Sequence, residues 1–148
     1  MKKLVVIILF SLVLLSVRAQ NISFESFIQD SRIGLQTGYG VYYLNKNGWG
    51  VGTVFQSSIW KPTESTGTNY SFIGLEARVP IQNCSRLKLY FAPKIGLVNK
   101  DFLVFLPELQ TEYLITNSFG MGVGAGVRMR EAAVSFKVFF QPFKKLGS

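Results

Sequence analysis

The strongest constraint on the fold is a two-residue alternation that recurs along most of this 148-residue chain. In seven segments every second side chain is apolar, and the side chains between them are mainly glycine, polar or charged. Successive side chains of a β-strand point to opposite faces, so this period predicts strands with one apolar and one mixed face. The seven strands are expected over residues 33–43, 49–59, 70–81, 86–98, 102–114, 119–129 and 134–140, with turn-forming residues between them.

An eighth strand is expected over Asn21–Gln29, where Ile22, Phe24 and Ile28 alternate less regularly. The same stretch also fits a short helix, because Phe24, Phe27 and Ile28 have helical spacing. Bacterial membrane barrels have an even number of strands and at least eight, so parity favours the strand. Eight crossings of roughly eleven residues with short turns need about 115–125 residues, and residues 20–148 supply them.

The distribution of charge and glycine favours a membrane barrel over a soluble sandwich. The apolar face of the seven strands carries no charged residue. Glycines, among them the ladder at 120, 122, 124 and 126, lie on the charged face, where they would weaken a solvated strand but leave room inside a narrow barrel. We therefore expect a charge network in the lumen, made by Glu76, Arg78, Arg86, Lys88, Lys94, Glu108, Glu112, Arg128 and Lys137.

Aromatic residues at the strand ends support the same interpretation. By strand parity the outward-facing set at one rim is Tyr43, Trp49, Tyr113, Phe119 and Phe140. An aromatic girdle of this kind marks the interface of a membrane barrel. A soluble β-sandwich or a lipocalin-like barrel gives the same alternation and remains the alternative.

The first 19 residues have the features of a secretory signal. Lys2 and Lys3 precede the apolar run Leu4–Leu15, and Val17 and Ala19 occupy positions −3 and −1 of a small-residue cleavage site. The apolar run is shorter than the about 20 residues that a membrane-spanning helix needs. We expect a signal peptide at residues 1–19 and one outer-membrane barrel domain at residues 20–148. The Ala19-Gln20 junction resembles that of exported proteins of Bacteroidota-type bacteria.

Charge and residue types argue against several function classes. Without Lys2, Lys3 and Arg18, residues 20–148 keep 13 of the 16 bases and all eight acids, a net charge of +5. These bases are scattered rather than grouped in a stripe, so we expect no nucleic-acid partner. The chain has no histidine and a single cysteine, Cys84, in a turn. We expect no cofactor, no metal site and no catalytic residues.

The whole pattern resembles the small eight-stranded outer-membrane barrels, the general family of outer-membrane proteins A and X. The resemblance covers residues 20–148 and includes Val134, Phe136, Val138 and Phe140, which are similar to the terminal signal that the barrel-assembly machinery recognises. It implies an all-β, antiparallel up-and-down barrel in outer-membrane lipid. Enzymes of this architecture use a histidine-assisted serine, which this chain lacks. The tail Gln141–Ser148 departs from the family, whose members commonly end at the aromatic residue.

The sequence favours a structural or surface-interaction role. Two alternatives remain: a narrow pore or small-ligand transporter, and a soluble periplasmic barrel that binds an apolar ligand.

Pro93 and Pro107 fall almost opposite each other about the turn at Lys100. Because proline removes a ladder hydrogen bond, residues 94–106 are expected either to lean out past the rim as a hairpin or to stay in lipid. In the first case the hairpin and the polar loop 61–69 contact an envelope or surface protein, through a candidate partner surface that includes Lys61, Thr66, Phe102 and Phe105.

Overall fold

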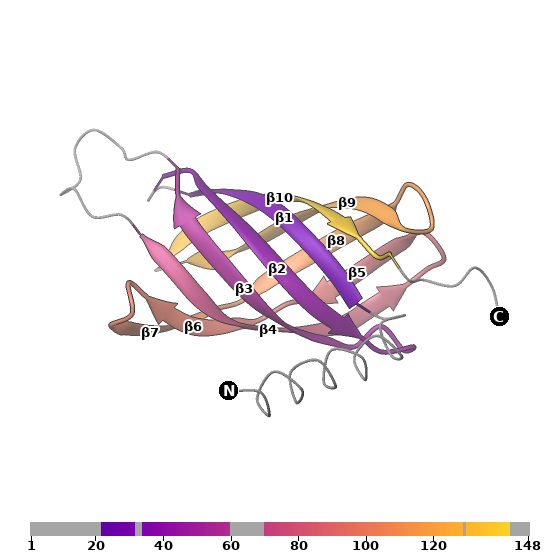
Figure 1. Cartoon of the computed structure of the whole chain (residues 1–148), viewed down its shortest axis with the longest axis horizontal. Coiled ribbons are helices and arrows are strands. Elements are labelled where there is room, and N and C mark those ends of the chain that lie inside the picture. Colours follow the sequence, from indigo (N-terminus) through magenta and orange to yellow (C-terminus); the bar gives the residue numbers. More distant parts are fainter. Residues whose placement is uncertain (1–21, 32–33, 60–69, 129, 143–148) are drawn as a thin grey trace, which may run out of the picture.

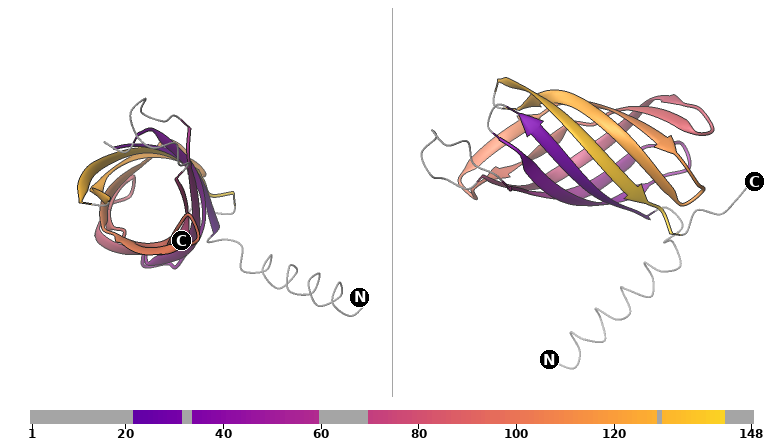
Figure 2. Two further views of the ribbon diagram at one scale, coloured as in Figure 1. Left: turned by 90° about the vertical axis from the view of Figure 1, so that its left-hand side faces the viewer. Right: turned by 90° about the horizontal axis from the view of Figure 1, so that it is seen from above.

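The protein is a closed, tilted β-barrel, seen end-on as a ring in Figure 2. The computed structural model describes residues 22–31, 34–59, 70–128 and 130–142. The strands in this part of the chain are β1 (Ile22–Ser31), β2 (Gln36–Leu44), β3 (Gly50–Ser58), β4 (Ser71–Asn83), β5 (Leu87–Phe91), β6 (Lys94–Val98), β7 (Phe102–Leu106), β8 (Glu108–Leu114), β9 (Phe119–Arg128) and β10 (Glu131–Phe140) (Figure 1). Within the described ranges no helix is long and apolar enough to cross a membrane.

These strands make eight crossings of the barrel wall. Strands β5 and β6 are two halves of one crossing, and β7 and β8 are two halves of another. All pairings are antiparallel; β1 pairs with β10, and β3 pairs with β4 to close the ring. The predicted antiparallel, up-and-down, eight-stranded barrel is confirmed. The uncertain first segment is strand β1, not a helix, and it continues to Ser31.

The register fixes a strong tilt of the strands. A path of directly paired residues that starts at Phe102 passes Val98, Phe72, Gln56, Gly38, Phe27, Lys137 and Gly122 and returns to its first crossing at Glu112. The path ends ten residues farther along the chain, from 102 to 112. For eight strands, such a stagger gives a barrel whose interior is just wide enough for side chains to fill it.

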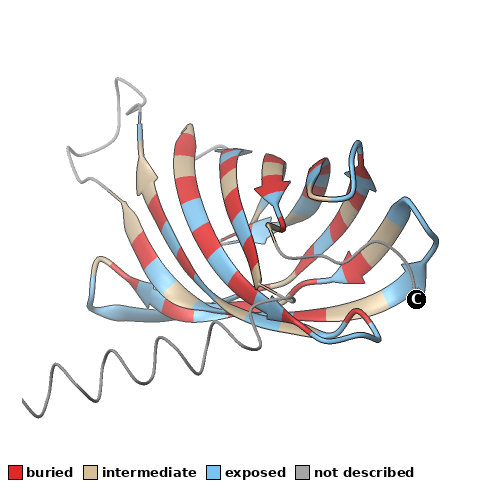
Figure 3. Cartoon of the chain, turned by 45° about the vertical axis from the view of Figure 1, so that its right-hand side comes forward, coloured by how far each residue is buried: buried red, intermediate tan, exposed pale blue. Residues whose placement is uncertain are grey.

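The alternation in the sequence becomes an inside and an outside, visible as alternating burial along each ribbon in Figure 3. In β9 the glycines at 120, 122 and 124 are buried, and Met121, Val123 and Ala125 are exposed. The exposed large side chains of the barrel are apolar, whereas most of its buried charged and amide side chains point inward. The five predicted rim aromatics are exposed and lie at the barrel end that also holds Ile22, which we call the girdle end.

The two prolines interrupt the wall where the sequence predicts. Pro93 separates β5 from β6, and Pro107 separates β7 from β8. The hairpin of β6 and β7 does not lean out as a whole, because β6 stays paired with β4 over Lys94–Val98. Only β7 has a free side: among the described strands its partner is β6. Strand β9 has already ended at Arg128, so nothing described continues the ladder beside β7.

Gly74 and Gly96 face each other across β4 and β6, and they bring the two backbones close together. A Cβ atom built on Gly96 would lie 2.3 Å from the carbonyl oxygen of Ile73 and 2.5 Å from the Cα atom of Gly74. Backbone atoms cannot rotate away as a flexible side chain can. A larger residue at this position must therefore deform the wall.

We predict that Gly96→Val lowers the unfolding stability of the barrel by about 1–3 kcal/mol, the range for an overpacked interior. The matched control is Thr53→Val, on the exposed outer face of β3. Denaturant unfolding in detergent micelles, followed by the gel mobility of unboiled samples, measures both. Equal midpoints for the two variants would contradict the close approach of β4 and β6.

Candidate functional site

The interior of the barrel, its lumen, holds a set of buried charges. Among the described residues eight ionisable side chains of Asp, Glu, Lys and Arg are buried, and each is at most 5% exposed. Four are acids and four are bases, and they come from β1, β4, β6, β8, β9 and β10: Glu25, Glu76, Arg78, Lys94, Glu108, Glu112, Arg128 and Lys137. Their presence on inward positions follows directly from the strand alternation.

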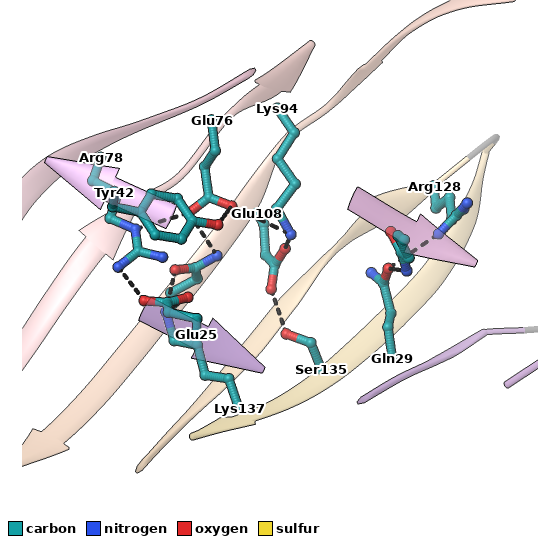
Figure 4. A network of polar contacts seen from close by, with 12 residues as sticks. Glu25, Gln29, Tyr42, Glu76, Arg78, Lys94, Glu108, Arg128, Ser135 and Lys137 are labelled. Carbon is teal, nitrogen blue, oxygen red and sulfur yellow. Dashed lines mark hydrogen bonds and ion pairs between the residues drawn. The ribbon is translucent and has the colours of Figure 1, made fainter. Parts of the chain in front are cut away.

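Arg78 lies at the centre of this network (Figure 4). Its guanidinium group is 2.5 Å from Glu25, 2.9 Å from Glu76 and 3.0 Å from Glu112. The same group lies over the Tyr42 ring, 3.7 Å from the ring centroid. The planar guanidinium has five donors in a fixed geometry and can therefore hold several carboxylates at once. Arg78 thus links β4 to β1 and β8 across the lumen.

Two lysines complete the network. Lys94 donates to Glu108 and lies 3.6 Å from Glu76. Lys137 donates to Glu112 at 2.7 Å and to Gln110 at 2.5 Å, and lies 3.8 Å from Glu25. Every carboxylate in the set therefore has a cationic partner, as buried carboxylates require.

Neutral donors add hydrogen bonds to two of the carboxylates, Glu76 and Glu108. The hydroxyl of Tyr42 donates to Glu76 at 3.0 Å, and the side-chain amide of Gln110 donates to the same carboxylate at 3.4 Å. The Ser135 hydroxyl donates to Glu108. Neutral partners of this kind make the network less dependent on any one ion pair, because each added bond offsets part of the desolvation of the charge.

A second polar cluster lies at the opposite, loop end of the barrel. Arg128, the last residue of β9, donates to the side-chain carbonyls of Gln29 and Gln36 and is 3.2 Å from Gln29. The amide of Gln56 donates to the same two carbonyls, at 2.5 Å and 2.7 Å. Unlike the other buried bases, Arg128 has no carboxylate within salt-bridge distance among the described residues.

Apolar side chains fill the space around these polar clusters. One cluster of buried side chains consists of Phe27, Tyr42, Val54, Phe72, Val98 and Leu106. At the girdle end Leu44, Leu114 and Phe139 are buried. An eight-stranded barrel has little room beyond its own side chains, and here aromatic, aliphatic and ion-paired groups occupy it. These groups hold the barrel wall together from inside.

The structure places most of the predicted lumen residues inside, with one correction. Glu76, Arg78, Lys94, Glu108, Glu112, Arg128 and Lys137 are buried in the lumen, and Lys88 is half-buried opposite Glu112 in the β5–β8 ladder. Arg86 does not lie in the lumen: it is an exposed residue of the turn between β4 and β5. The prediction applied strand parity to residue 86, which lies one residue before β5 begins and is still part of the turn.

The remaining predicted site residues lie on β7 or outside the described part of the chain. Phe102 and Phe105 are exposed, as a contact surface requires. Lys61 and Thr66, and the signal peptide at residues 1–19, fall outside the described residues. Sequence reasoning missed Glu25, because the first segment alternates irregularly, and it missed the glutamine cluster, because uncharged amides carry no obvious signal. Glu25 is identified once β1 is accepted as a strand, since parity then points it inward.

Sequence comparison and structure comparison give different information about this chain. No protein-family model matches it, and no curated protein matches it in sequence. A de novo designed transmembrane β-barrel is similar in structure, with 10% identity, a TM-score of 0.67, and 82% of this chain and 94% of that chain covered. Two natural proteins are also similar.

Neisserial surface protein A has 12% identity and a TM-score of 0.55, with 82% of this chain and 94% of that chain covered. The outer membrane protein Ail of Yersinia pestis, in a phospholipid bilayer nanodisc, has 10% identity and a TM-score of 0.56, with 81% and 97% covered. The fold is therefore that of the eight-stranded outer-membrane barrels, as expected. Nothing in these likenesses supports the expected Bacteroidota origin.

We predict that Glu112→Ala strongly destabilises the barrel, because it leaves Arg78 and Lys137 without one of their carboxylates. Removing one partner of a buried ion pair costs roughly 3–5 kcal/mol. The control is Arg86→Ala, at a position that strand parity also assigns to the lumen but that the structure exposes. Denaturant unfolding in micelles should lower the midpoint for Glu112→Ala alone; equal midpoints would contradict the buried network.

Proposed function

We propose that this chain is a non-enzymatic surface protein of the bacterial outer membrane, held in the bilayer by its barrel and contacting a partner outside the cell. The observation that carries the proposal is the inverted arrangement of the barrel: charges fill the lumen, and the exposed outer face is apolar. A soluble barrel of this kind would place in water the large apolar side chains that the structure exposes on every crossing. In lipid the same face is stabilised.

The aromatic girdle and the last strand agree with membrane insertion. Tyr43, Tyr113 and Phe140 are exposed at the girdle end on β2, β8 and β10, where amphipathic rings sit at a membrane interface. On β10 the outward residues Val134, Phe136 and Phe140 form the pattern that resembles the signal for the barrel-assembly machinery. We propose that machinery, and outer-membrane lipid, as the partners of assembly.

The partner contact is proposed for β7. Phe102 and Leu103 are the most exposed large apolar side chains of the described residues, at 67% and 69%. The carbonyl of Pro107 accepts a bond from Val127 on the β9 side, and that of Glu108 accepts one from Ala92 on the β5 side. Along a strand the N–H and C=O groups of successive residues point alternately to the two neighbouring strands. The β6–β7 pair has the same register as the β5–β8 pair, so this alternation continues from β8 into β7. The N–H and C=O groups of Leu103 and Phe105 therefore point to the open side.

An open edge with apolar side chains can accept an additional strand. A second barrel in the same membrane is a poor candidate. Two copies of β7 can pair antiparallel only if a two-fold axis perpendicular to the barrel wall relates them. Such an axis lies in the plane of the membrane, so one barrel would be upside down relative to the other. We therefore propose an extended segment of a different envelope or surface protein as the partner.

A narrow pore or small-ligand transporter is less well supported. The lumen is occupied by ion pairs and by buried apolar side chains at the girdle end, so conduction would require several groups to separate. A soluble periplasmic barrel with an apolar ligand would need an apolar interior, whereas here the interior carries eight buried charges.

The proposal is tested by cysteine labelling on intact cells, in a Cys84→Ser background because Cys84 is exposed. Single cysteines at Leu103 and Phe105 should react with a membrane-impermeant reagent, as should a cysteine at Thr66 in the predicted polar loop. The matched control is a cysteine at Val123, outward-facing in the middle of β9, which lipid should protect. The protein should also stay in the outer-membrane fraction after a high-salt wash.

Two results would contradict the proposal in different ways. Recovery in the soluble periplasm would end the membrane interpretation altogether. Retention in the membrane with Leu103 and Phe105 both protected, while Thr66 reacts, would leave the barrel in place and reject the β7 surface.

A further inference from the structure

Among the described residues, one buried base of the lumen has no carboxylate within salt-bridge distance. The central network contains four carboxylates and the three bases Arg78, Lys94 and Lys137. Lys88 stands directly opposite Glu112 in the β5–β8 ladder and supplies a fourth base. The central network is therefore balanced without Arg128, which lies separately at the loop end.

Within the described part of the chain the hydrogen-bond partners of Arg128 are neutral, and Glu131, its register partner on β10, lies beyond salt-bridge distance of it. The Arg128 residue is 2% exposed. Within the described residues it donates hydrogen bonds to the side-chain carbonyls of Gln29 and Gln36. Neutral amides solvate a guanidinium but do not cancel its charge. A buried charge is normally paired, because the low-dielectric interior makes an isolated one unfavourable.

In this cluster two buried donors lack an acceptor, whereas one buried acceptor, the Oε1 atom of Gln56, lacks a donor. The Nε atom of Arg128 and the side-chain nitrogen of Gln36 are buried and have no acceptor. The Oε1 atoms of Gln29 and Gln36 both accept from Arg128 and from Gln56, so each of these carbonyls is already shared by two donors. What the cluster lacks is an acceptor that carries negative charge.

A small cavity lies against this cluster. Its lining includes Gln29, Arg128, Lys94 and Glu108, and it has room for roughly one water-sized particle. Glu108 does not supply the missing charge, because one of its oxygens accepts from Lys94 and the other from Ser135. Lys94 likewise is engaged with Glu108 and Glu76.

We propose that the loop end of the lumen binds one small monovalent anion of halide size in this cavity, held by Arg128 and by the amide of Gln29, which both line it. Chloride has the charge that the site requires and is among the smallest common monovalent anions. The anion accepts from the Nε atom of Arg128, which otherwise has no acceptor, and it neutralises the buried base that lacks a carboxylate partner among the described residues. Bound there, it fastens the end of β9 to the end of β1. The site does not depend on the partner proposed for β7.

The test measures the stability of the purified full-length barrel in micelles as sodium chloride or bromide replaces sodium gluconate at constant ionic strength. The thermal midpoint of the wild-type barrel should rise and saturate. Arg128→Gln should abolish the dependence on halide, whereas Arg130→Gln, an exposed base in the neighbouring turn, should keep it. Sodium phosphate should not replace halide, because it exceeds the cavity.

Crystals of the wild-type barrel soaked in sodium bromide give a second measurement that does not need a folded variant. Anomalous density for bromide beside Arg128 would support the site. The proposal is overturned by density for water alone at that position, by a midpoint that does not change with halide, or by a saturable rise that persists in Arg128→Gln. Stabilisation by phosphate in place of halide would overturn the assignment of a halide-sized anion.

Discussion

Closure of a narrow, strongly tilted barrel is the constraint on which the rest of the structure depends. Once the first and last strands pair and β3 pairs with β4, every second side chain is committed to a lumen that side chains alone must fill. Each inward polar group must then find its partner across the lumen. The bonds from Arg78 to carboxylates on β1 and β8 are a result of that requirement, and they in turn hold distant strands in one register.

The glycines of the wall follow from the same constraint. A lumen that contains Arg78, Tyr42 and Lys137 has no space for further side chains on the facing strands. Gly52 meets the Tyr42 ring, and Gly122 lies against the stem of Lys137. The small residues and the long ones are therefore two parts of one packing arrangement, and a substitution at either kind of position affects the other.

Much of this arrangement could be predicted from the sequence because strand alternation has a period of two and depends little on context. It identified the eight crossings, the inward charges of β4, β8 and β10, and the breaks at Pro93 and Pro107. It failed where the sequence pattern stops being regular: Arg86 is exposed because the chain turns there, and Glu25 was missed because the apolar alternation of the first segment is imperfect. It could not show that, among the described residues, Arg128 has no carboxylate within salt-bridge distance and β7 has an open edge, because both depend on the stagger between distant strands.

The central claim is that the apolar face points to lipid and the charged face to a closed lumen. Spin labels placed singly along β9, from Met121 to Gly126, in the barrel reconstituted into phospholipid bilayers test it most directly. Collision rates with oxygen should alternate with a period of two, high at residues 121, 123 and 125 and low at 122, 124 and 126. High collision rates with a water-soluble nickel complex at residues 121, 123 and 125 would contradict the account, because that face would then be in water.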